Sequence, residues 1–191
     1  MPLQLPVGGS GPPHEPPPYG GLGPDGWARG RTFLELVESA GTAAAALRAA
    51  FAATEVEETR RAFFIAYPRP VRVLALADLG GTDSVTNVAQ AERLFTLGQH
   101  IWMRILLAHE HADVRQLFAS PELPLLVFFG ADKREFGRWG PRPRALLDAE
   151  GNVAPAALDA FRADFYARSR GRDLAAELCA RLASHTDPTL A

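Results

Sequence analysis

The stretch VRVLALADLGGTDSVTNVAQAERLF, residues 71–95, decides the predicted fold. Its first seven residues form an apolar run of strand length, and Gly80 and Gly81 then provide a turn. After the turn, apolar residues recur at helical spacing as far as Phe95, and Gly98 is placed to cap the end of that helix. The pattern predicts a strand, a tight turn and a helix, an arrangement at which many α/β proteins carry their chemistry. The turn itself has no cysteine, lysine or histidine.

The composition sets limits on the class of protein. A chain of 191 residues, 47% hydrophobic and 22% charged, allows one globular domain and an extra segment. A net charge of -2 gives no reason to expect nucleic-acid binding. The chain has no apolar run long enough for a membrane span and no signal-peptide pattern, so we expect a cytoplasmic protein, and its Ala-, Arg-, Leu- and Pro-rich composition suits a bacterial genome. Cys179 is the only cysteine, which excludes an internal disulfide and a cysteine-rich metal site.

The regions on either side of this stretch differ in character. Residues 1–30 are rich in proline and glycine and predict a disordered tail. Residues 31–67 predict an N-terminal helical segment that starts with a capping box of Thr32 and Glu35. Residues 31–191 are expected to form a single domain, with a core at 71–143 and a C-terminal helix at 155–184 that Gly171 is placed to break.

The core region alternates between strand and helix patterns. Three further strands are predicted at residues 101–108, 123–129 and 135–139, with a short helix at 113–119. The first two strands, joined through a helix, are expected to be parallel, and the last two, joined by a tight turn, antiparallel. The sequence therefore predicts an α/β fold with a four-stranded mixed sheet and helices on both faces.

Three segments of this core resemble the thioredoxin superfamily. They are the turn DLGGTDS at residues 78–84, the ELP before LLVFF, and FGRWGPRP at residues 136–143, which is similar to a segment of one bacterial branch. The resemblance covers residues 71–143, and the last helix extends it. It implies a thioredoxin-like three-layer sandwich, preceded here by the extra helical segment, and a cis peptide bond before Pro124.

The same resemblance shows a departure at the redox site. Gly81 and Ser84 stand where the family has its two redox cysteines, Gly80 stands where it has a tryptophan, and only Asp83 is retained. Thiol–disulfide exchange requires an attacking thiolate, so this turn cannot perform it with its own residues. We expect Asp83 or Ser84 to cap the following helix; the alternative is that the helix N-terminus contacts a ligand.

Two functions remain open from the sequence. The first is a non-catalytic binding or scaffold protein without a cofactor, in which the resemblance implies a peptide or small thiol bound by residues 80–84, among them Thr82, and by Pro124 and Trp139. The second is a thiol–disulfide oxidoreductase that uses Cys179 or a bound low-molecular-weight thiol.

The remaining polar residues give weaker signals. Arg142 and Arg144 are interpreted as exposed cations. His109 and His111 lie two residues apart without a third ligand at a suitable spacing, so no metal site is predicted.

Overall fold

The computed structural model describes residues 18–186 apart from residues 24, 120 and 121. Its centre is a four-stranded sheet in the order β2-β1-β3-β4. The pair β1–β2 is parallel, and the pairs β1–β3 and β3–β4 are antiparallel, as predicted. The strands are β1 (Val71–Ala77), β2 (Ile101–Leu107), β3 (Leu125–Phe129) and β4 (Glu135–Trp139).

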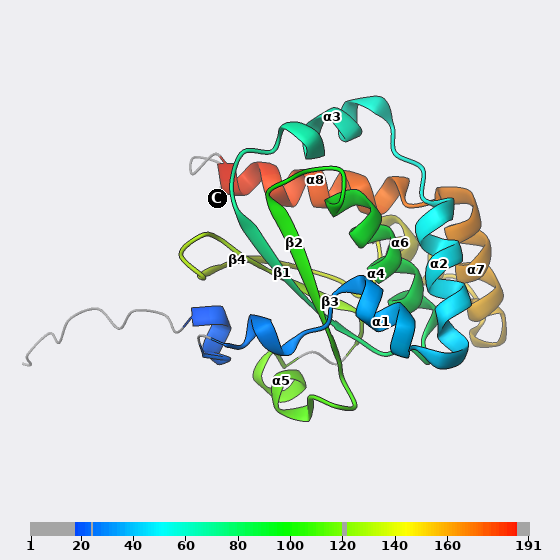
Figure 1. The fold of residues 1–191 in the computed structure, drawn as a ribbon. Coiled ribbons are helices and arrows are strands. Elements are labelled where there is room, and N and C mark those ends of the chain that lie inside the picture. Colours follow the sequence, from blue (N-terminus) through cyan, green and yellow to red (C-terminus); the bar gives the residue numbers. More distant parts are fainter. Residues whose placement is uncertain (1–17, 24, 120–121, 187–191) are drawn as a thin grey trace, which may run out of the picture.

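Helices cover both faces of the sheet, which confirms the predicted three layers (Figure 1). The helices are α1 (Phe33–Ser39), α2 (Ala44–Ala53), α3 (Glu58–Ala66), α4 (Thr82–Phe95), α5 (Ala112–Leu117), α6 (Arg144–Glu150), α7 (Leu158–Ser169) and α8 (Arg172–Thr186). Helices α1 to α4 and α8 contribute to the core on one face, and α5 covers the other. Among these elements, α6 was not predicted, since its seven residues carry only a short apolar pattern. No helix in the described part of the chain is long and apolar enough to cross a membrane.

The apolar core is divided by the sheet because side chains alternate between its faces. On β1, Val73, Ala75 and Ala77 face α4 and α8, whereas Leu74 and Leu76 face α5. The near-continuous apolar run of β1 is thereby explained: this strand lies inside the sheet and is covered on both sides.

The segment before α1 differs from the predicted tail. Tyr19 is only 3% exposed and packs edge-to-face on Phe129, with 5.3 Å between the ring centroids. Arg31 forms an isolated antiparallel bridge to Ile105 on β2. The tail boundary at Gly30 is therefore too late, because aromatic side chains between the glycines and prolines hold residues 18–30, apart from 24, on the α5 face. Residues 1–17 of the predicted tail lie outside the described residues.

Local signals in the sequence correspond to local features of the backbone. Thr32 and Glu35 form the predicted capping box at the start of α1. The Leu123–Pro124 peptide bond is cis, in agreement with the expectation. The predicted C-terminal helix is divided into α7 and α8, because Arg170 and Gly171 adopt φ values of 49° and 87°.

Candidate functional site

The turn between β1 and α4 is stabilised by its own hydrogen bonds. The Asp78 side chain accepts a hydrogen bond from the Gly80 amide at 3.0 Å, and the Asp78 carbonyl accepts one from the Gly81 amide at 3.1 Å. The Ser84 hydroxyl oxygen accepts the Asp78 amide at 3.1 Å. Gly81 is the N-cap of α4 and no side chain caps this helix, so the expectation that Asp83 or Ser84 caps it was wrong.

Asp83 is instead buried and held by two side chains from later in the chain. Its Oδ2 lies 2.6 Å from Nε of Arg142, and its Oδ1 accepts the Tyr166 hydroxyl at 2.7 Å. Burial, and then the neighbouring Asp83 charge, raise the pKa of Tyr166 far above its ordinary value. Tyr166 therefore remains protonated and acts as a donor to the carboxylate.

This pair belongs to a larger network of alternating charge. Arg142 Nη1 lies 3.2 Å from Glu150, whose other oxygen lies 2.8 Å from Arg162. Arg142 Nη2 also lies 3.7 Å from Glu122, in the loop before β3. We call Asp83, Asn87, Arg142, Glu150, Arg162 and Tyr166 the Asp83 network. Its two guanidinium groups and two carboxylates neutralise one another.

Arg142 corrects an expectation from the sequence. Its side chain is 9% exposed, so it is not an exposed cation, whereas the Arg144 side chain is 78% exposed and forms an ion pair with Asp148 on its own helix. Asn87 links the network to the backbone: its Nδ2 donates to the Tyr166 hydroxyl at 2.9 Å and to the Pro141 carbonyl at 3.3 Å.

Of the predicted site residues, the 80–84 turn and the Pro124 loop are connected through Arg142, whereas Trp139 packs against α8. Arg142 connects the 80–84 turn, through Asp83, to Glu122 two residues before the buried Pro124. The backbone at Gly140 passes so close to the Pro124 carbonyl that a Cβ atom there would overlap it. Trp139 lies against α8, where its Nε1 donates to Glu177 at 2.5 Å, so its contacts belong to the packing of the sheet on that helix.

A hollow of about 240 Å³ lies beside the cis-proline loop. Apolar and polar groups both line it: Phe118, Ala119, Leu125 and Pro141 with Glu122, Arg138 and the backbone of Gly140. The Arg138 guanidinium is held there by Glu135 at 2.7 Å and by the Phe118 carbonyl at 3.0 Å. The hollow thus combines an apolar surface with a fixed cation.

Cys179 lies away from this end of the sheet, on α8. It is half-buried against the core, and burial raises the pKa of its thiol to about 11. Because the thiolate is the nucleophile in thiol chemistry, only a very small fraction of Cys179 is reactive at neutral pH.

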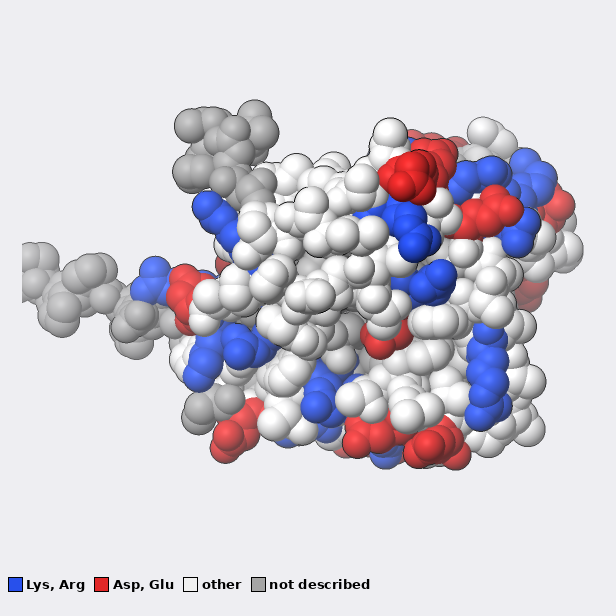
Figure 2. All heavy atoms as spheres, turned by 45° about the horizontal axis from the view of Figure 1, so that its top comes forward, with Lys and Arg blue, Asp and Glu red and all other residues white. Residues whose placement is uncertain are grey.

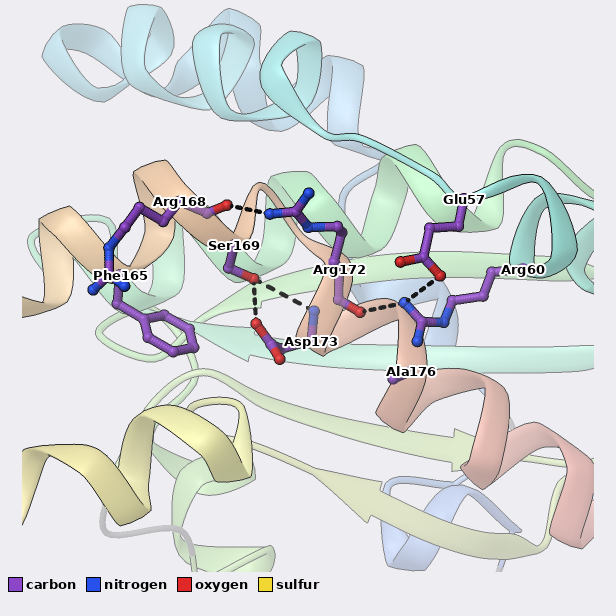
Figure 3. Close-up of a pocket in the computed structure, with 8 residues that line it drawn as sticks. All are labelled: Glu57, Arg60, Phe165, Arg168, Ser169, Arg172, Asp173 and Ala176. Atoms are coloured by element: carbon purple, nitrogen blue, oxygen red, sulfur yellow. Dashed lines mark hydrogen bonds and ion pairs between the residues drawn. The ribbon is translucent and has the colours of Figure 1, made fainter.

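A larger hollow of about 400 Å³ lies between α3 and the junction of α7 and α8 (Figure 3). Its arginines are engaged with neighbouring groups: Arg60 contacts Glu57 at 3.1 Å and the Arg172 carbonyl at 3.0 Å, and Arg172 donates to the Arg168 carbonyl at 2.7 Å. These bonds satisfy backbone carbonyls at the helix junction, so the cluster serves to fix the junction.

The outer surface offers no strong field of one sign in the view of Figure 2, where acidic and basic side chains are interspersed. Within the described ranges, no three His, Cys, Asp or Glu residues are placed to hold a metal ion. His111 lies 3.2 Å from the Arg29 guanidinium, and burial followed by that charge lowers the pKa of its imidazole.

Sequence reasoning missed most of the Asp83 network. Asn87 lies on the predicted helix and is a polar residue among mostly buried ones. Arg142 lies inside the GRWGPRP segment that the sequence analysis singled out. A polar residue on the buried face of a helix was the one available signal for Asn87. Glu150, Arg162 and Tyr166 carry no signal in the sequence, because their partners are distant along the chain.

Comparison with known proteins agrees with this architecture. A family model described as thioredoxin matches residues 30–156. The fold is similar to the crystal structure of a protein of unknown function from Pseudomonas aeruginosa, with a TM-score of 0.67 at 20% identity over 83% of this chain and 95% of that chain. It is also similar to an HIV epitope scaffold, with a TM-score of 0.64 at 18% identity over 82% of this chain and 94% of that chain.

At these identities the solved structures establish the fold alone, and no curated protein matches the chain. The family model is more informative, because it covers well over half of the chain and includes the whole sheet. The chain therefore belongs to the thioredoxin family.

Proposed function

We propose that this protein is a non-catalytic binding or scaffold protein in which Gly81 and Ser84 have replaced the redox cysteines of the family. The observation that carries the proposal is the turn before α4, where Gly81 has no side chain and the Ser84 hydroxyl accepts a hydrogen bond from the Asp78 amide. Asp83 is the second residue of α4, and both of its carboxylate oxygens are bound by Arg142 and Tyr166.

The electrostatics of the α4 N-terminus support this proposal. In a redox-active site, the positive end of the helix dipole stabilises a thiolate. Here the first turn of α4 carries the Asp83 carboxylate, whose charge Arg142 neutralises at 2.6 Å. The Asp83–Arg142 ion pair lies two residues after Gly81, which we place at the family's first cysteine, and the turn itself has no thiol that the helix dipole could activate.

The cis-proline hollow is the proposed binding surface, with an extended peptide as its ligand. Its volume of about 240 Å³ lies below the range of roughly 300–1,000 Å³ that is typical of pockets for whole small molecules. A hollow of this size suits one or two side chains of a peptide that lies against Pro124. Phe118 and Leu125 would contact an apolar side chain, and Arg138 would face a polar or acidic one.

The second candidate function is an oxidoreductase that uses Cys179 or a bound small thiol. The raised pKa of Cys179 and its contact with the core argue against the first version. An insulin-reduction assay with and without added glutathione separates the candidates. We expect no rate above the buffer control in either arm. A rate that requires the protein would contradict the non-catalytic proposal, and loss of that rate in Cys179→Ala would assign it to this thiol.

Binding is tested by selecting a phage-displayed library of random linear peptides against the full chain and measuring the enriched peptides by calorimetry. Ala119 lines the cis-proline hollow, so we expect the larger side chain of Ala119→Trp to obstruct it and to reduce peptide affinity at least about tenfold. Ala163→Trp, an equally large change at an exposed position on α7, is the matched control and should leave affinity unchanged. Equal affinities for both variants would exclude this hollow as the peptide site.

A further inference from the structure

A third hollow, of about 330 Å³, lies at the opposite end of α4 from the Asp83 network. It is lined by the C-terminal part of α4, by the beginning of β2 and by Trp27 from the segment before α1. It is separate from the cis-proline hollow, since the two share no lining residue. Its volume falls within the range of small-molecule pockets.

This hollow passes over the edge of the sheet. β2 is the outermost strand, and its consecutive residues 101–104 all line the hollow. Because side chains alternate along a strand, Ile101 and Met103 face α4, whereas Trp102 faces the other side. Trp102 is 44% exposed, so part of its ring is open to solvent.

Glu92 is the acidic group of this hollow, and its carboxylate has no partner among the residues that the structure describes. No hydrogen bond or ion pair joins it to another described side chain, and burial raises its pKa to about 7. It lies in the last turn of α4, where the helix dipole also disfavours a negative charge. Glu92 is half-buried at the wall of the hollow, so a positive group that enters the hollow could pair with its carboxylate.

The neighbouring cations do not supply that group. Arg104 lines the hollow, but it lies over the Trp27 ring at 5.1 Å and 3.5 Å from Glu35 on α1. Arg93, next to Glu92 on α4, lies over the Phe51 ring of α2 at 5.7 Å. Both guanidinium groups are thus engaged by other partners.

We propose that this hollow binds a small organic amine, whose ammonium group pairs with Glu92 while its apolar body lies over the β2 edge against Trp102. The carboxylate supplies the charge. Met103, Phe95 and Ile101 supply apolar contacts, and the exposed Trp102 ring offers both apolar area and a face that attracts cations. This site is independent of the proposed peptide surface.

The test compares two probes of the same shape, phenethylamine and phenethyl alcohol, added to the full chain at about pH 8, where Glu92 is mostly ionised. Binding is followed by calorimetry and by the NMR signals of the indole N–H groups. We expect the amine to bind at least about tenfold more tightly than the alcohol, and to shift the Trp102 signal. Glu92→Gln should remove this preference, and Trp102→Ala should weaken both probes.

Glu38→Gln, at an exposed position of α1, is the matched control and should bind the amine like the parent protein. Lowering the pH to about 6 should weaken amine binding in the parent protein but not the residual binding of Glu92→Gln. The proposal is overturned if the amine does not bind at millimolar concentration, if amine and alcohol bind equally, or if Glu92→Gln retains the preference.

Discussion

Helix α4 carries a buried carboxyl group, Asp83, and a half-buried one, Glu92, and the two have opposite surroundings. Asp83, in the first turn, is bound by Arg142 and Tyr166. Glu92, in the last turn, has no partner in the described part of the chain. The helix dipole favours the first charge and disfavours the second. Burial by itself does not determine the role of an acidic group, because its partners and its place on the helix decide whether its charge is stable.

The comparison also separates two ways in which a fold uses polar groups. The Asp83 network lies beside the turn that we propose corresponds to the redox site of the family, and each guanidinium in it is paired with a carboxylate. In the hollow at the other end of α4, Glu92 has no partner in the described part of the chain and lies beside the apolar side chains of Phe95 and Met103. The first arrangement stabilises a structure, and the second is suited to a ligand.

The largest change in stability is expected when the ion pair between Asp83 and Arg142, at the N-terminal end of α4, is removed. Arg142→Met leaves Asp83 and Glu150 buried without their shared cation, which should lower the free energy of unfolding by about 3–5 kcal/mol. Urea unfolding followed by circular dichroism measures this change. Arg144→Met is the control and should change stability by less than about 0.5 kcal/mol, because its ion pair is exposed. A loss below about 1 kcal/mol for Arg142→Met would show that the network contributes little.

At the C-terminal end of α4, a substitution of Glu92 is expected to raise the free energy of unfolding rather than lower it. The pKa of Glu92 is raised from 4.5 to about 7, so the folded state binds more protons than the unfolded state between these values. The contribution of Glu92 to stability is therefore present below about pH 4.5 and is lost as pH rises through about 7. Glu92→Gln should be more stable than the parent protein by about 2 kcal/mol at pH 8, and this difference should vanish near pH 4.5.

Thermal or urea unfolding over this pH range measures the difference between the two proteins. The exposed Glu38→Gln should follow the pH dependence of the parent protein. If Glu92→Gln gives a constant difference from pH 4.5 to 8, Glu92 does not titrate in this window, and its environment is not that of an unpaired buried acid.

Tyr166→Phe is expected to have a smaller effect at the paired end. It removes the hydroxyl that donates to Asp83, while Arg142 remains in place, so we expect the free energy of unfolding to fall by about 1.5 kcal/mol. In the Arg142→Met background, Tyr166→Phe should change the free energy of unfolding by a different amount than in the parent protein, because both residues bind the same carboxylate. Strict additivity in this double-mutant cycle would contradict a coupled network.

The smallest change in stability, within about 1 kcal/mol, is expected for the combined substitution Gly81→Cys and Ser84→Cys. Gly81 has a φ of -103°, and an added Cβ would meet only the Asp78 carbonyl at 3.7 Å, so a cysteine is tolerated there. Ser84→Cys removes one hydrogen bond to the Asp78 amide. We expect a disulfide by thiol titration and a gain of insulin reduction. A folded variant whose thiols stay reduced under oxidising conditions would show that positions 81 and 84 are not the family's cysteine pair.

Several elements could be predicted from the sequence because their signals are local. The capping box of Thr32 and Glu35 needs residues three apart, and the strand–turn–helix of residues 71–95 follows from apolar spacing. The proline and glycine content of residues 1–30 was a weaker guide. It did not predict that Tyr19 packs on Phe129, since that contact joins residues 110 positions apart (129 minus 19).

The sequence by itself determined the absence of a dithiol, the order of the strands along the chain and the family resemblance of the core. Only the tertiary structure decided that Asp83 is paired and Glu92 is not. Arg142 and Tyr166 reach Asp83 across 59 and 83 residues of chain, and nothing in their local sequence distinguishes them from exposed residues. The physical reason is that the charge state of a buried group depends on which distant side chains the fold brings within a few ångströms, and on how much water it removes.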